Sequence, residues 1–62
     1  MSKNFWDIFL PEDIIIVSAR YNGKDGTATI KFLYHNSNVQ HIANFTRVKV
    51  LDREVWTLDE IK

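Results

Sequence analysis

Basic side chains recur through the middle of this sequence, with aromatic residues between them. The basic residues are Arg20, Lys24, Lys31, Arg47 and Lys49. Small β domains bind single-stranded nucleic acid by stacking the bases on exposed aromatic rings beside a positively charged groove. The pattern therefore makes nucleic-acid binding one hypothesis for this chain, with these five residues as the contacts.

The positions of the aromatic residues weaken that hypothesis. In the alternating segment 27–35, Phe32 and Tyr34 share a face with Ile30, so we expect both rings in the core. Lys31 belongs to the opposite face, as an ordinary solvated residue does. The formal net charge is zero, whereas dedicated nucleic-acid-binding domains are basic. Nucleic-acid binding is therefore the alternative hypothesis rather than the leading one.

A second group of apolar side chains lies near the two ends of the chain. It consists of Phe5, Trp6, Phe9, Leu10 and Trp56. A two-turn segment such as 4–10 carries more apolar residues than it can bury against a small sheet. Exposed aromatic residues are frequent anchors of protein interfaces, although two tryptophans can also simply close the end of a minimal domain. We expect this group to bind a larger protein, and so modulate it, or to mediate self-association.

Paired carboxylates are the remaining groups with catalytic potential. Glu12-Asp13 and Asp59-Glu60 are adjacent acids that could serve general acid–base catalysis. Neighbouring side chains usually point apart, however, and both pairs follow helix-start signals, where acids stabilise the helix dipole. The sequence contains no glycine-rich phosphate loop, nucleophile elbow or HExxH motif. We therefore expect binding rather than catalysis, with no catalytic residue, cofactor or small-molecule substrate.

The two histidines raise the question of a metal site. His35 and His41 would lie close together across a tight turn, and Asp52 or Glu54 could complete a ligand set. Two histidines alone cannot supply the four ligands of a closed zinc site. The chain has no cysteine, which excludes disulfides and thiolate ligands. We expect the histidines to be ordinary surface groups and the chain to bind no metal.

The length of the chain and the positions of its charges limit the class of protein that it can be. Its 62 residues form one small domain, 1–62, and such a domain buries only about 60% of the surface of its unfolded chain. No apolar run approaches the about 20 residues that cross a membrane, and charges interrupt the apolar stretch 5–17 where a signal peptide would have none. We therefore expect a cytoplasmic protein without a membrane partner. Tiny neutral chains of this kind are common among bacterial and phage accessory proteins.

The first half of the chain predicts a short helix and a β-hairpin. The helix is expected over 4–10, because Asn4 can cap it and Pro11 stops it. The run of four β-branched residues that begins at Ile14 predicts a strand over 14–21 that is covered on both faces. A helix over the same residues is the rival interpretation, because Pro11 and Asn22-Gly23 would punctuate it well. The turn 22–26 then leads into an alternating strand over 27–35.

The second half predicts further strands with one ambiguous segment. A polar turn is expected at 35–38, and 39–46 fits either a helical turn or a strand. A strand over 47–51, a tight turn at Asp52-Arg53 and a returning strand over 54–58 follow. Residues 57–60 match a capping box, which allows at most one helical turn before the chain ends.

Together these elements predict a mainly β, small α+β fold. A short N-terminal helix precedes four or five strands, arranged as an antiparallel meander or an SH3-like barrel. Acidic residues are concentrated near both ends of the chain and basic residues in its middle. That charge layout could steer a protein partner or align two copies head to tail.

Overall fold

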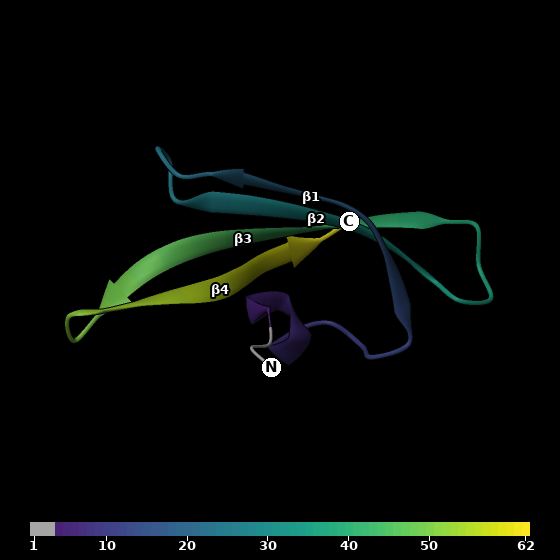
Figure 1. Cartoon of the computed structure of the whole chain (residues 1–62), viewed down its shortest axis with the longest axis horizontal. Helices are drawn as coiled ribbons and strands as arrows, with labels where there is room; N and C mark the ends of the chain where they lie inside the picture. Colours follow the sequence, from purple (N-terminus) through teal and green to yellow (C-terminus); the bar gives the residue numbers. More distant parts are fainter. Residues whose placement is uncertain (1–3) are drawn as a thin grey trace.

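Four antiparallel strands in chain order form one open sheet (Figure 1). The computed structural model describes residues 4–62. A single turn of 3-10 helix, η1 (Phe5–Ile8), precedes the strands β1 (Ile14–Asn22), β2 (Thr27–Tyr34), β3 (Gln40–Val50) and β4 (Arg53–Ile61). Each strand pairs only with its neighbours in the sequence. The prediction of a mainly β meander is therefore confirmed.

The predicted N-terminal helix is a 3-10 turn rather than an α-helix. Six residues separate Asn4 from Pro11, too few for a stable α-helix because its first turn is costly to form. The backbone N–H of Asn4 donates to a carboxylate oxygen of Asp7 at 3.2 Å, which closes the turn. Within residues 4–62, no helix is long and apolar enough to cross a membrane.

The sheet is open, so the SH3-like barrel is not confirmed. β1 and β4 form its two edges instead of pairing with each other. All of the ambiguous segment 39–46 except Val39 belongs to β3, which runs unbroken for 11 residues, so residues 4–62 contain four strands and not five. Residues 57–60 lie within β4 and form no helical turn, because pairing with β3 satisfies their backbone.

The turn between β1 and β2 is the one the sequence predicts at 22–26. The side-chain oxygen of Asn22 accepts hydrogen bonds from the backbone N–H groups of Lys24 and Asp25, at 3.2 and 3.3 Å. Gly26 follows with φ of +68°, a conformation that glycine adopts without steric cost. Its carbonyl accepts the backbone N–H of Arg47 at 2.7 Å, which ties this hairpin to β3.

The turn between β3 and β4 lies one residue earlier than predicted. Val50 pairs with Arg53, so the two-residue loop is Leu51-Asp52. Both residues have positive φ, +48° and +64°, as a type I′ hairpin turn requires. Leucine is an unusual residue for such a position because its Cβ crowds the backbone there.

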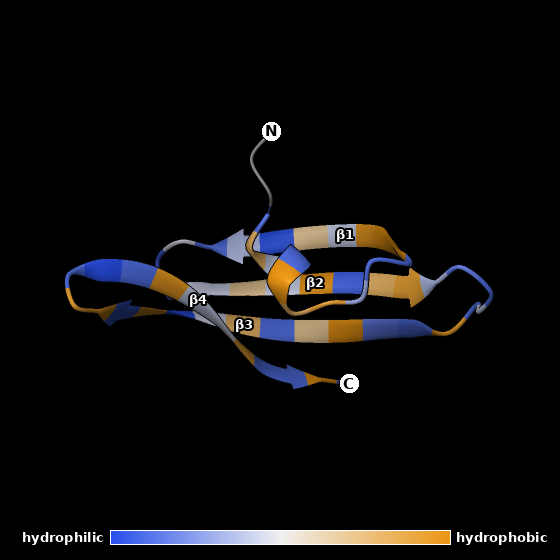
Figure 2. Ribbon diagram, turned by 90° about the horizontal axis from the view of Figure 1, so that it is seen from below, coloured by the Kyte–Doolittle hydropathy of each residue, from blue (hydrophilic) through white to orange (hydrophobic). Residues whose placement is uncertain are grey.

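The hydrophobic core lies on one face of the sheet, which we call the core face; the opposite face is the open face. The buried residues are Leu10, Ala28, Ile30, Phe32, Ala43 and Phe45. The cross-strand pairs Ala28–Phe45 and Ile30–Ala43 place the centre of the core on β2 and β3. Residues 4–10 lie across this face, as Figure 2 shows.

The β1 strand differs from its prediction in burial. We expected cover on both faces, yet Ile15, Ile16 and Val17 are all exposed. β1 lies at an edge of the sheet, and a β-bulge at Val17 interrupts its register with β2. Because β1 has a strand partner on one side only, its β-branched side chains stay accessible.

Candidate functional site

The N-terminal segment is held on the core face by stacked aromatic rings. The ring of Phe5 lies parallel to that of Trp56, with centroids 4.4 Å apart, and meets the ring of Phe45 edge-on at 5.1 Å. Trp6 meets Phe5 edge-on at 5.2 Å. Such pairs contribute about 0.5–1.5 kcal/mol each beyond the area they bury. Phe5 is therefore the anchor that fixes η1 over β3 and β4.

The predicted protein-binding residues all lie on the core face, but they differ in accessibility. Leu10 is buried in the core, and Phe5, Trp6 and Trp56 are partly buried against it. Phe9 stays exposed, with its ring 5.7 Å from that of Phe45. The structure thus brings the five residues together and leaves four of them with accessible surface.

Two residues of β1 extend this surface and were missed by the sequence analysis. Tyr21 is 57% exposed and lies 6.3 Å from Trp6 between ring centroids. Partial burial raises the pKa of its phenol above the ordinary value of 10.0. Ile16 is exposed on the same face, opposite Phe32 of β2. Ile16 and Tyr21 are five residues apart, so regular alternation would place them on opposite faces. The extra residue in the bulge at Val17 brings them to the same face, which the sequence pattern does not indicate.

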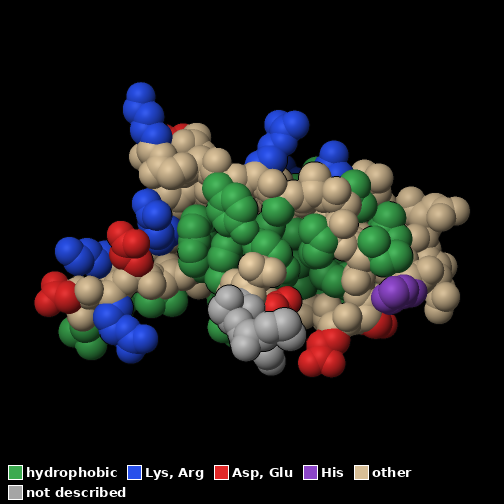
Figure 3. All heavy atoms as spheres, in the orientation of Figure 1, with side chains coloured by type: hydrophobic (Ala, Val, Ile, Leu, Met, Phe, Trp, Pro, Cys, Tyr) green, Lys and Arg blue, Asp and Glu red, His purple; other side chains and the backbone are tan. Residues whose placement is uncertain are grey.

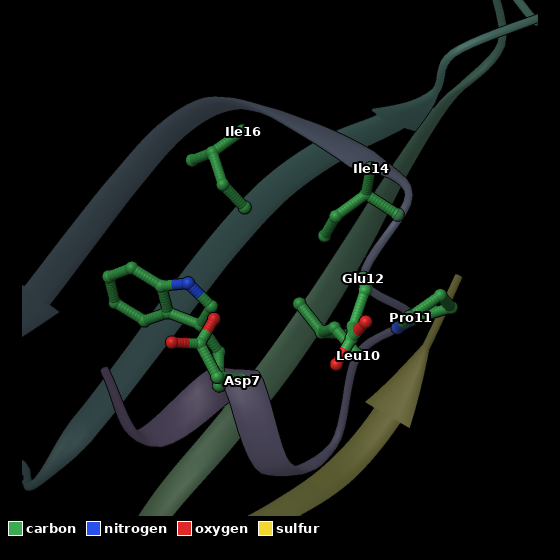
Figure 4. A pocket seen from close by; sticks show the side chains of 7 residues that line it. Asp7, Leu10, Pro11, Glu12, Ile14 and Ile16 are labelled. Carbon is green, nitrogen blue, oxygen red and sulfur yellow. The ribbon is translucent and has the colours of Figure 1, made fainter. Parts of the chain in front are cut away.

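A cavity of about 240 Å³ lies between the N-terminal segment and β1 (Figure 4). Its lining consists of Trp6, Asp7, Leu10, Pro11, Glu12, Ile14 and Ile16. In Figure 4 the side chains of Ile14 and Ile16 form an apolar wall on the β1 side, and Leu10 lies on the opposite side together with the carboxylates of Asp7 and Glu12. No basic residue lines the cavity. The site is therefore an apolar recess with a negatively charged border.

The exposed apolar surface is continuous around this recess. Figure 3 shows hydrophobic side chains gathered in a band across the middle of the molecule, with basic and acidic side chains grouped beside it over the β3–β4 hairpin. The band lies over the core-face side of the sheet, which the N-terminal segment covers in part. Apolar patches of this kind on small proteins commonly mark contact surfaces.

The five predicted nucleic-acid contacts do not form one surface. Arg20 pairs with Thr29 and Lys31 pairs with Ser18, which places both cations on the open face. Together with Ile42 they line a recess of about 270 Å³. Lys24 lies in the β1–β2 turn instead. Arg47 and Lys49 follow Phe45 at period two along β3, so they belong to the core face.

Arg47 is engaged by its own chain. Its Nη2 donates to the carbonyl of Gly23 at 3.4 Å, its Nε lies 3.9 Å from a carboxylate oxygen of Glu54, and its guanidinium lies 5.9 Å from the ring centroid of Trp56. The ring of Phe32 is buried, as expected, and so is that of Phe45, so neither can stack on bases. Tyr34, which we expected in the core, is 38% exposed because it is the last residue of β2, at the margin of the core. Arg20 and Lys31 therefore lie on the opposite face from the aromatic rings, and Arg47, which shares the core face with those rings, is already paired within the chain.

The suggested metal ligands are far apart. The imidazole of His41 stacks on the ring of Phe32 at 5.5 Å near the start of β3, whereas Asp52 lies in the turn beyond the other end of that strand. At about 3.3 Å per residue they are separated by roughly 30 Å. Among residues 4–62, no three His, Asp or Glu side chains gather closely enough to hold a metal ion.

The carboxylate pairs occupy different settings. Glu12 and Asp13 are exposed in the link between η1 and β1. Asp59 accepts a hydrogen bond from the hydroxyl of Thr46, and Glu60 accepts one from the side-chain amide of Asn44 at 3.3 Å. The second pair is thus part of a polar cross-strand network. Of the four acids in these two pairs, only Glu12 lines the recess beside η1.

Comparison with known proteins adds no assignment. No protein-family model matches the chain, and neither a curated protein nor a solved structure matches it.

Proposed function

We propose that this chain is a small interaction protein that acts by binding, and that it docks a segment of a larger protein on its core face beside η1. The observation that carries the proposal is the incomplete cover of that face. Four strands contribute to it, whereas the covering segment is only residues 4–10. A sheet buries its apolar face against a second layer in stable domains, and here that layer is partial.

The residues around the recess have the character of an interface. Trp6 and Tyr21 present partly accessible aromatic rings, and Ile16 lies exposed between the recess and β2. Aromatic residues that are partly packed at a surface often dominate binding energy, because they bury a large area at low cost in side-chain entropy. This group is consistent with docking of an apolar segment.

The recess supports a specific partner chemistry. At about 240 Å³ it is smaller than the roughly 300–1,000 Å³ of typical small-molecule sites. It suits one side chain of a partner protein. The apolar wall fits an aliphatic stem, and the carboxylates of Asp7 and Glu12 favour a positive charge at its end. The preferred partner segment therefore carries an arginine or lysine flanked by apolar residues.

Binding can be tested without knowing the partner. Selection from a phage-displayed peptide library on the wild-type protein is expected to enrich peptides with a basic residue between apolar ones. The Glu12→Lys variant should bind the selected peptides at least tenfold more weakly, because a lysine beside the recess repels their cation. Asp13→Lys is the matched control, since Asp13 is exposed and adjacent but does not line the recess.

The location of binding provides a second readout. Titration of the isotope-labelled protein with a selected peptide should shift the indole N–H of Trp6 and the amides of Ile14 and Ile16. Shifts confined to Arg20 and Lys31 on the open face would contradict the proposal. So would selected peptides without a basic residue that bind Glu12→Lys as tightly as the wild type.

Nucleic-acid binding is the alternative function, and one observation favours it. Arg20 and Lys31 are neighbours on the open face, which no element among residues 4–62 covers. Anisotropy of labelled oligonucleotides across a salt series tests this surface. Steeply salt-dependent affinity that is lost in Arg20→Glu with Lys31→Glu would establish it, whereas no binding at low salt would remove it.

A further inference from the structure

We propose that the free edge of β1 pairs antiparallel with β1 of a second copy, joining two sheets into one across a two-fold axis. This inference goes beyond the proposed function, because it concerns the edge of the sheet rather than its core face. The two interfaces can form independently. Symmetric dimers of this kind are the commonest protein assemblies, since one patch serves both subunits.

The sequence of β1 does not match its surroundings in the single chain. Ile14, Ile15, Ile16 and Val17 form a run of β-branched residues that is typical of strands covered on both sides. In the single chain only Ile14 is partly covered, and the other three are exposed. A second strand along this edge would cover the flanks of these side chains.

The two edges of the sheet differ in the number of charged residues that they carry. Edge strands that must remain unpaired usually carry charges, because a charge resists burial beside another strand. β4 carries four charged residues, Arg53, Glu54, Asp59 and Glu60. β1 carries only Arg20. Charges thus protect the β4 edge against pairing, whereas the first half of β1 has no charged residue and only the bulge at Val17 interrupts it.

The register follows from the side of the sheet on which each residue lies. Opposite β2, Ile14, Ile16, Ala19 and Tyr21 occupy the core face of β1. Directly opposed residues of an antiparallel pair share a face. Placing Ile14 opposite Tyr21 of the second copy, and Ile16 opposite Ala19, keeps both core faces on the same side. The two-fold axis then passes between Val17 and Ser18, so the two bulges lie side by side.

This register also suits the charges. Arg20 lies opposite Ile15 of the second copy, five residues along the strand from the other Arg20. At about 3.3 Å per residue the two arginines are roughly 17 Å apart, and salt largely screens their repulsion at that distance. The acidic residues Glu12 and Asp13 approach the β1–β2 turn of the second copy, where Lys24 and Asp25 balance each other. The pairing therefore brings no excess of like charges together while it covers apolar surface on both strands.

The test compares one substitution on each edge. Ile15 and Val55 are both 43% exposed, and both lie on the open face, opposite Leu33 and Val48. Sedimentation equilibrium over a range of concentrations should show the wild type in a monomer–dimer equilibrium. Ile15→Lys should weaken dimerisation at least 100-fold, whereas Val55→Lys should leave it within threefold of the wild type. Far-ultraviolet circular dichroism verifies that both variants keep the sheet.

Cross-linking tests the register itself. The natural chain has no cysteine, so I15C/R20C introduces the only thiols. Residues 15 and 20 of one β1 strand are too far apart for an internal disulfide. Oxidation should give a covalent dimer, whereas V55C/E60C, which has the same spacing on the same face of β4, should remain monomeric.

Three results would overturn the inference. They are a wild type that is monomeric at millimolar concentration, a dimer that Val55→Lys breaks and Ile15→Lys does not, and an I15C/R20C variant that does not cross-link.

Peptide binding by Ile15→Lys separates this inference from the proposed function. Loss of the dimer with peptide binding retained supports both. A wild-type dimer without any peptide binding removes only the proposed function.

Discussion

At the scale of single residues, Leu51 is in an unfavourable backbone conformation that nothing nearby compensates. It has φ of +48°, and its side chain is 91% exposed at the tip of the β3–β4 hairpin. A leucine in the left-handed region costs about 1 kcal/mol or more relative to its ordinary conformations. Asparagine tolerates this region and is favoured at the first position of type I′ turns.

Leu51→Asn is therefore expected to raise the free energy of unfolding by about 0.5–1 kcal/mol. Leu51→Val, whose branched Cβ fits positive φ even less well, should lower it by a similar amount. Urea denaturation followed by tryptophan fluorescence measures both. If the asparagine variant proved less stable, Leu51 would be making a packing contribution that its exposure does not suggest.

At the scale of elements, the N-terminal segment acts as a short cover held by two kinds of contact. The ring of Phe5 stacks on Trp56, and Leu10 inserts into the core just before Pro11 turns the chain towards β1. η1 contributes little by itself, since one turn of 3-10 helix has poor hydrogen-bond geometry. Side-chain burial therefore decides whether the segment stays on the sheet.

Leu10→Ala is expected to lower the free energy of unfolding by about 2–4 kcal/mol, through lost burial and the void that remains. Ile8→Ala is the matched control in the same segment. Ile8 is 80% exposed and Leu10 only 6%, so the control should change stability by less than about 0.5 kcal/mol. Thermal and urea unfolding give both values. Equal effects would mean that the segment is not anchored through Leu10.

At the scale of the whole molecule, the domain is extended. Its radius of gyration is 12.3 Å and its dimensions are 40 × 25 × 17 Å, whereas a compact chain of 62 residues has a radius near 10.6 Å, roughly 2.2·N^0.38 Å. One sheet with a partial cover buries less surface than two full layers. Such a domain gains stability from association, because binding favours the folded state.

The melting temperature should consequently depend on protein concentration. Dimerisation through β1 predicts that Tm rises by several degrees over a 100-fold increase in wild-type concentration, because mass action shifts the equilibrium towards the folded dimer. The Tm of Ile15→Lys should be independent of concentration. Differential scanning calorimetry at several concentrations measures this. A constant wild-type Tm would argue against a dimer that is coupled to folding.

The local features of this fold could be predicted from the sequence. Asn22 and Gly26 specify the β1–β2 turn through a side-chain hydrogen bond and a positive φ. Pro11 ends the N-terminal segment that directly precedes it. Ile30, Lys31 and Phe32 alternate between apolar and charged residues, which assigns them to opposite faces of β2 whichever strands it pairs with. These outcomes depend on residues that are close in sequence.

The tertiary structure alone decided the features that depend on distant pairing. Residues 40–46 are strand because β2 pairs along them, and β1 is exposed because the sheet does not close onto β4. The bulge at Val17 shifts the faces of β1, so Tyr21 joins the core face while Arg20 joins Lys31 on the open face. Composition and spacing indicated a binding protein with an aromatic surface. Which residues share that surface was set by strand register, a long-range property that no local pattern encodes.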